Sequence, residues 1–168
     1  KRICEVEHLR RKDKEVTDMS RIRDILDACA VCRLGIYDKT QDEVYIVPMN
    51  FAYSLEKGAL TLYFHSALSG RKINLLRENP SVSFEMDCGH RLIPHTFPCE
   101  YSYGYSCIMG TGTVSFTDSP DQKAAVLSLL MEKQTGAACP VQKEQTASVA
   151  VFQINVKQFS CKAQKSDT

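Results

Sequence analysis

The chain lacks the features that place proteins in several large classes. Its 168 residues carry a net charge of only +1, so no electrostatic excess draws it toward nucleic acid or acidic membranes. No apolar run is long enough to cross a bilayer. The first 17 residues are charged throughout and have none of the apolar core of a signal peptide. We therefore expect a cytoplasmic protein with no nucleic-acid partner and no membrane partner.

Internal repeats and low-complexity tracts are also missing, and the composition is that of an ordinary globular domain. Hydrophobic residues make up 43% and charged residues 24% of the chain, which argues against disorder. The length suits one compact domain, predicted over 17–160, between a charged arm at 1–16 and a polar tail at 161–168. In a reducing cytosol the eight cysteines are expected to be free thiols, most of them either small buried apolar side chains or surface thiols without a role.

The hydrophobic periodicity predicts a mainly β fold with flanking helices. Helices are expected from Thr17 or Asp18 to about residue 29, over 71–78 and over 120–134. Six strands are expected, at 31–37, 43–52, 60–65, 81–87, 105–116 and 148–159, with an irregular loop at 88–104. Most neighbouring strands are joined by tight turns, which favours an antiparallel sheet curled into a barrel. Gly110 and Gly112 indicate a bend or the close approach of something flat.

Segment 63–72 carries the strongest chemical signal. A strand ends there, and two hydroxyls, a glycine and two cations lead into a helix whose unpaired N–H groups attract an anion. Ser66 and Ser69 could donate hydrogen bonds, while Arg71 and Lys72 supply charge, and Arg71 can grip a phosphate through two N–H groups. The alternative is a serine-capped helix with solvated cations, but each cation there opposes the helix dipole by about 0.3–1 kcal/mol. The segment predicts a phosphate site.

A second segment, 47–51, suits a flat heteroaromatic ring. Pro48 removes an N–H from the strand, which leaves a neighbouring backbone carbonyl free or opens a gap beside the strand. Asn50 adds an amide that can both donate and accept hydrogen bonds. The alternative is an edge strand in which the proline blocks aggregation. The apolar residues on both faces of this strand indicate that it is covered on both sides, by helices or by a partner.

Three motifs together resemble one family. Val-Pro-Met-Asn-Phe at 47–51, Tyr-Phe-His-Ser-Ala at 63–67 and Gly-Arg-Lys at 70–72 are similar to the FMN-binding split-barrel superfamily of pyridoxamine 5'-phosphate oxidase. Within it the resemblance is to the nitroimidazole-resistance (5-nitroimidazole reductase) branch, and it runs from about residue 11 to residue 159. It implies a six-stranded antiparallel split β-barrel that forms a homodimer with FMN at the subunit interface.

The resemblance also implies roles for individual residues. The flavin ring would lie against 48–51, and the phosphate would meet Ser66, Arg71 and Lys72. The strand near 105–108 would approach the flavin of the other subunit. His65 falls on the family's active-site histidine, where it could polarise or protonate a substrate, or alternatively only bind the phosphate or a backbone carbonyl. The expected cofactor-binding residues are Val47, Pro48, Met49, Asn50, Phe51, His65, Ser66, Ser69, Gly70, Arg71, Lys72, Ser106, Cys107 and Ile108.

The expected function is an FMN-dependent oxidoreductase that reduces a small electron-poor acceptor such as a nitroaromatic. The electron donor is expected to be diffusing NAD(P)H or a reductase, because no GxGxxG fingerprint for a bound nicotinamide nucleotide is present. Pyridoxamine-phosphate oxidase activity itself is disfavoured, because by similarity it needs arginines near the C-terminus and the last arginine here is Arg91.

Two alternatives stay open. One is a carrier or sensor of flavin or haem without turnover, since FMN, FAD and haem are not distinguished by the sequence. The other is a structural metal, held by sulfur and imidazole ligands on the 88–107 segment. Its candidate ligands would be Cys88, His90, His95, Cys99 and Cys107, whose spacing matches no recognised zinc pattern, so no metal site is expected.

Overall fold

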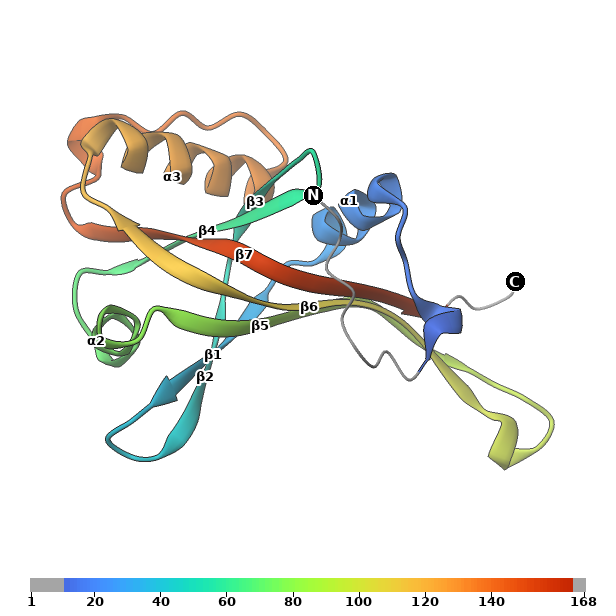
Figure 1. The fold of residues 1–168 in the computed structure, drawn as a ribbon. Helices are drawn as coiled ribbons and strands as arrows, with labels where there is room; N and C mark the ends of the chain where they lie inside the picture. Colours follow the sequence, from blue (N-terminus) through green and yellow to red (C-terminus); the bar gives the residue numbers. More distant parts are fainter. Residues whose placement is uncertain (1–10, 165–168) are drawn as a thin grey trace.

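Within residues 11–164, which the computed structural model describes, an open antiparallel sheet is surrounded by three α-helices (Figure 1). The strands cross the sheet in the order β2-β1-β5-β6-β7-β4-β3. They are β1 (Cys32–Asp38), β2 (Glu43–Met49), β3 (Ala52–Glu56), β4 (Ala59–Ala67), β5 (Ser81–Ile93), β6 (Ser102–Thr117) and β7 (Val149–Gln164). The helices are α1 (Met19–Ala28), α2 (Arg71–Glu78) and α3 (Pro120–Thr135), with short 3-10 turns at Lys12–Lys14, Pro98–Glu100 and Lys143–Gln145.

Antiparallel pairing is confirmed, but the sheet has seven strands rather than six and does not close. The expected strand 43–52 is two strands, because β2 ends at Met49 and β3 begins at Ala52. The alternation of inward and outward side chains slips at this point, since Phe51 and Ala52 are both buried. As β2 and β3 occupy opposite ends of the strand order, the barrel of the described chain is split between these two edges.

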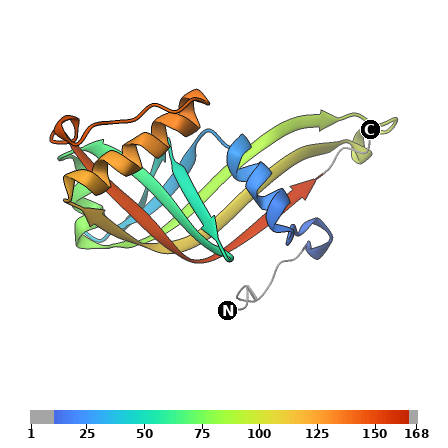
Figure 2. The same ribbon diagram turned by 90° about the horizontal axis from the view of Figure 1, so that it is seen from above.

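The three helices lie where the sequence predicts them. Asp18 caps α1 by accepting a hydrogen bond from the backbone N–H of Ser20, and Ser119 caps α3 by accepting one from Gln122. Seen from above, α3 runs along the outside of the sheet, where it contacts β3, β4 and β7 (Figure 2). The other two helices contact different strands, α1 against β5 and β6 and α2 against β1. None of the described helices is long and apolar enough to span a membrane.

The expected loop at 88–104 is instead mostly a β-hairpin. Strands β5 and β6 continue into it past a bulge between Cys88 and Arg91, where Gly89 adopts a φ of 70° (Figure 2). The last strand is also longer than expected. It continues into the predicted tail as far as Gln164, and its Cys161 is buried against β6. Residues 1–10 of the predicted arm, and 165–168 of the tail, lie outside the described residues.

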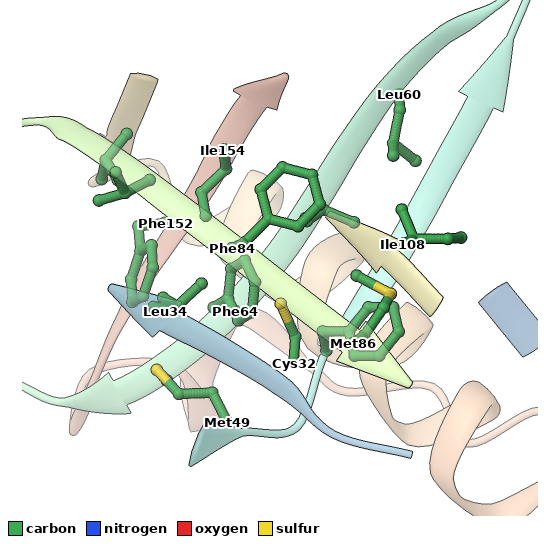
Figure 3. Packing of buried hydrophobic residues seen from close by; sticks show 14 of the residues in the cluster. Cys32, Leu34, Met49, Leu60, Phe64, Phe84, Met86, Ile108, Phe152 and Ile154 are labelled. Carbon is green, nitrogen blue, oxygen red and sulfur yellow. The ribbon is translucent and has the colours of Figure 1, made fainter. Parts of the chain in front are cut away.

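The inward face of the sheet holds one aromatic and aliphatic core (Figure 3). The rings of Phe64 and Phe152 stack with centroids 5.3 Å apart, joining β4 to β7. Gly110 explains part of the glycine signal in β6: a Cβ there would lie 2.6 Å from the Phe84 ring and 2.5 Å from the Gln158 carbonyl oxygen. The flat group that lies close to this glycine is thus the ring of Phe84, a side chain of the core.

We expect Gly110→Ala to lower the free energy of unfolding by about 1–3 kcal/mol, because a backbone oxygen and a packed ring must both move to admit the methyl group. Gly104→Ala is the matched control, since its Cβ would meet its nearest neighbour at an ordinary 3.5 Å. Urea unfolding of both variants measures the difference. Equal stability of the two variants would contradict the packing seen around Gly110.

Candidate functional site

The N-terminus of α2 differs from those of the other two helices. Its N-cap residue is Gly70, with φ 134° and ψ 168°, a conformation that favours glycine, and no side chain caps the helix. The first turn contains no acidic residue, and it opens with Arg71 and Lys72. The N–H groups of this turn therefore have no capping side chain, and the turn contains no carboxylate of its own to balance their partial positive charge. Such a turn can hold an anion.

Arg71 lies at the centre of a charged cluster that joins α2 to the β1–β2 hairpin. Its Nη2 donates to Oδ2 of Asp38 at 3.0 Å and to Oε1 of Glu43 at 2.5 Å. Its guanidinium also lies over the Tyr45 ring, 4.6 Å from the centroid. Sequence reasoning missed these two carboxylates, because about thirty residues of chain separate each of them from Arg71.

Asp38 is the fixed member of this cluster. Its carboxylate accepts hydrogen bonds from the hydroxyl and N–H of Thr40 and from the N–H of Gln41. The Thr40 hydroxyl, with help from Arg71, lowers the pKa of Asp38 to about 2. Asp38 is therefore ionised at neutral pH, and it holds Arg71 at the start of α2.

The expected cofactor-binding residues divide between the two faces of the sheet. Those whose side chains are buried on the core side are Val47, Met49, Phe51, Ser66, Ser106 and Ile108. The exposed residues are Pro48, Asn50, His65, Ser69, Gly70 and Arg71, while Lys72 and Cys107 are half-buried. A ligand on the outside of the barrel could contact the residues with buried side chains only through their backbone atoms. The likeness of the motifs does not reveal this division, which comes from strand alternation.

His65 lies on the outer face of β4, between the buried residues Phe64 and Ser66. It sits two residues before the end of the strand and opposite Val151 of β7. Residues 65–72 therefore form one continuous group at the end of β4 and the start of α2. The exposed imidazole can exchange protons with a molecule bound outside the sheet.

Asn50 and Phe51 are held by the end of α3. The Asn50 Nδ2 donates to Oε1 of Gln134 at 3.2 Å. The Lys133 Nζ lies over the Phe51 ring and donates to the backbone oxygens of Leu26 and Cys29, both at 3.0 Å. Burial lowers the pKa of Lys133. This lysine satisfies carbonyls at the end of α1, so it fixes the segment that separates β2 from β3.

Residues 106–108 are not brought onto 47–51 within one chain. They belong to β6, and strands β1 and β5 lie between β6 and β2 in the sheet. Their predicted place beside the flavin of a second subunit stays a prediction.

An apolar groove on the outer face of the sheet was not predicted. It has a volume of about 510 Å³, and its lining comes entirely from β1, β2, β5, β6 and β7. Val44 and Ile46 border it and are 61% and 65% exposed. The feature of the sequence that could have revealed the groove was the apolar outer face of the 43–52 strand. That face indicated that the strand is covered on both sides. Within residues 11–164, no helix lines this groove.

The cysteines of the described chain are free thiols. Burial raises the pKa of Cys29 and Cys32, and it raises that of Cys161 to about 12, so these three stay protonated at neutral pH. All three are fully or nearly fully buried, which confirms the interpretation of them as small apolar side chains. The Cys99 and Cys139 thiols are exposed.

The candidate metal ligands on the hairpin pair with other groups. The His90 Nε2 contacts Asp87 at 2.8 Å, and the His95 imidazole contacts Glu100. Among residues 11–164, no three His, Cys, Asp or Glu side chains are grouped so that they could hold a metal ion.

Comparison with known protein families identifies the family of the chain. Residues 18–163 match the model of the pyridoxamine 5'-phosphate oxidase family, so the protein belongs to that family, as its motifs predicted. A search of curated proteins found no match.

Solved structures include a candidate 5-nitroimidazole antibiotic resistance protein from Bacteroides thetaiotaomicron. It is 29% identical to this chain, covers 90% of both chains and superposes with a TM-score of 0.75. A FAD-binding protein from Mesorhizobium loti is 24% identical, covering 88% of this chain and 96% of its own, with a TM-score of 0.61. A FAD and haem binding protein from Mycobacterium smegmatis is 16% identical, covering 91% and 74%, with a TM-score of 0.74. The last two establish likeness of fold alone.

Proposed function

We propose that this protein is a cytoplasmic FMN-dependent oxidoreductase that reduces small electron-poor acceptors such as nitroaromatic compounds. The observation that carries the proposal is the start of α2, which has no side-chain cap and opens with Arg71 and Lys72, a combination that suits a phosphate group. Family membership and the 29% identity to a candidate nitroimidazole resistance protein support the same assignment. The electron donor would be NAD(P)H or a reductase.

The residues would divide the work as follows. Ser69 and the first turn of α2 would donate hydrogen bonds to the phosphate, with Lys72 and Arg71 balancing its charge. The buried Ser66 could reach the phosphate only through its backbone. The backbone of 47–51 would face the ring, and the exposed imidazole of His65 would hold a proton for the acceptor. Bound FMN would supply the redox chemistry, which the side chains of the chain cannot provide.

The identity of the cofactor is the first test. We expect the purified protein to be yellow, and mass spectrometry of the released ligand to give FMN. A strong Soret band would instead favour a haem protein. A protein that stays colourless after incubation with FMN would contradict the proposal. A second measurement separates an enzyme from a carrier or sensor. The bound flavin is reduced chemically under nitrogen, and a nitroimidazole is then added. An enzyme should reoxidise its flavin rapidly, whereas a carrier or sensor should do so no faster than free reduced FMN.

We expect Lys72→Ala to weaken FMN binding by about tenfold, because one charge-assisted contact to the phosphate is lost. The unfolding temperature should hardly change, since the Lys72 side chain makes no ion pair within the described residues. Arg71→Ala should weaken FMN binding and also lower the unfolding temperature, because Asp38 loses its cation. Fluorescence titration and thermal melts measure both effects. Unchanged FMN affinity in both variants would reject the phosphate assignment.

We expect His65→Ala to retain FMN while slowing nitroreduction by about 100-fold or more, because a positioned proton donor is removed. Reduced FMN affinity with normal turnover at saturating flavin would instead assign His65 to cofactor binding. The same assay on His65→Gln, which keeps a hydrogen-bond donor but cannot titrate, separates a proton-transfer role from simple hydrogen bonding.

The exposed apolar groove favours a homodimer. Val44, Ile46, Met109 and Phe159 border it, and a second copy of the chain would cover them and bring its own residues 106–108 to the flavin.

We expect Ile46→Glu to shift the protein toward monomer and to reduce its flavin content, because a charge in a buried interface is left unpaired. Light scattering after gel filtration measures the mass. Met131→Glu is the control: Met131 is also an exposed apolar residue, but it lies on α3, away from the groove. Dimers of equal strength in both variants would place the interface elsewhere.

A further inference from the structure

The two carboxylates that bind Arg71 differ sharply in their surroundings. Both accept from the same nitrogen, Nη2, but the Asp38 side chain is 5% exposed and the Glu43 side chain 54% exposed. Within the described residues, every hydrogen bond of the Arg71 guanidinium passes through Nη2. A second, planar edge of the fork, which includes Nη1, is therefore left for another acceptor.

Asp38 is not free to leave Arg71. Its Oδ1 accepts from the Thr40 hydroxyl at 2.6 Å, the Thr40 N–H at 3.0 Å and the Gln41 N–H at 3.3 Å, all within the β1–β2 turn. Turning the carboxylate away would break these bonds and leave their donors unpaired at a partly buried position. Asp38 therefore acts as a fixed support for the guanidinium.

Glu43 is held much less firmly. It is the first residue of β2, its side chain is exposed, and Arg71 is its hydrogen-bond partner among the described residues. An exposed ion pair contributes little net stability, because water solvates both charges when the pair separates. Glu43 can leave Arg71 at small cost, whereas Asp38 cannot.

We propose that Asp38 positions Arg71 while Glu43 competes with the phosphate group of the cofactor for it, so that Glu43 sets how strongly the protein prefers a phosphorylated flavin over an unphosphorylated one. This inference rests on the proposed phosphate site at α2. A phosphate that binds the guanidinium through both Nη1 and Nη2 takes the place of the Glu43 carboxylate at Nη2. It also meets the electrostatic repulsion of that carboxylate, which weakens its binding.

If Glu43 competes with the phosphate, its substitution should strengthen FMN binding, whereas substitution of a residue that binds the ligand weakens it. Glu43→Gln should bind FMN about three- to tenfold more tightly than the unchanged protein at low ionic strength, because one negative charge near the phosphate is removed. Affinity for riboflavin, which has the same ring and no phosphate, should not change. The gain for FMN should shrink as salt screens the charges.

The experiment titrates flavin-stripped full-length protein with FMN and with riboflavin, following the quenching of flavin fluorescence. Glu56→Gln is the matched control. Glu56 is also an exposed glutamate, and it lies at the β3–β4 turn, at the opposite end of β4 from the start of α2. The control variant should bind both flavins as the unchanged protein does.

Asp38→Asn tests the positioning role. It should lower the ratio of FMN to riboflavin affinity, because Arg71 loses its fixed partner, whereas a purely structural effect would weaken both flavins alike. If that variant does not fold, the Glu43→Gln titrations still test whether Glu43 competes with the phosphate.

The outcomes separate the two proposals. Equal FMN affinity in Glu43→Gln and the unchanged protein, while the unchanged protein prefers FMN to riboflavin, overturns the competition and leaves the phosphate site standing. An unchanged protein with no preference for FMN over riboflavin removes the phosphate site, and the competition with it.

Discussion

The candidate site depends on one buried carboxylate. Asp38 ends β1, and the desolvation of its charge is offset only if donors surround it. The β1–β2 turn supplies three of these donors and Arg71 supplies the fourth. Because Arg71 is the first residue of α2, this requirement fixes the start of the helix beside the hairpin. The position of the helix start in turn determines where the loop from the end of β4 to α2 lies, and so where the residues next to His65 lie.

A second constraint is the pleat of the sheet. Inward positions fill the core, so the proposed site lies on the outside of the barrel, where Pro48, Asn50 and His65 are exposed. The outer faces of β1 and β2 also border the apolar groove, which no described helix lines. The proposed flavin site and the proposed dimer contact therefore draw on the same strands. A single chain contains the whole of the proposed phosphate site but does not bring residues 106–108 to residues 47–51.

Much of the local structure could be predicted. The helix starts at Asp18 and Ser119 and the start of α2 depend on capping and glycine preferences that act within a few residues. Residues 65–72 form one group because they are contiguous in the chain. The break at Asn50 could not be seen, because both Phe51 and Ala52 are apolar and only their joint burial interrupts the alternation. The hairpin at 88–104 was hidden by a bulge that disturbs its pairing.

The amino-acid sequence by itself determined the antiparallel strands, the three helices, the family and the cationic start of α2, since these follow from short-range backbone preferences and from residues close together in the chain. Only the tertiary structure decided which strands form the two edges, which carboxylates reach Arg71, and where the apolar groove opens. Those outcomes depend on the register between distant strands. That register is set where the hydrophobic faces of strands far apart in the chain meet in the core, so no single segment of the sequence determines it.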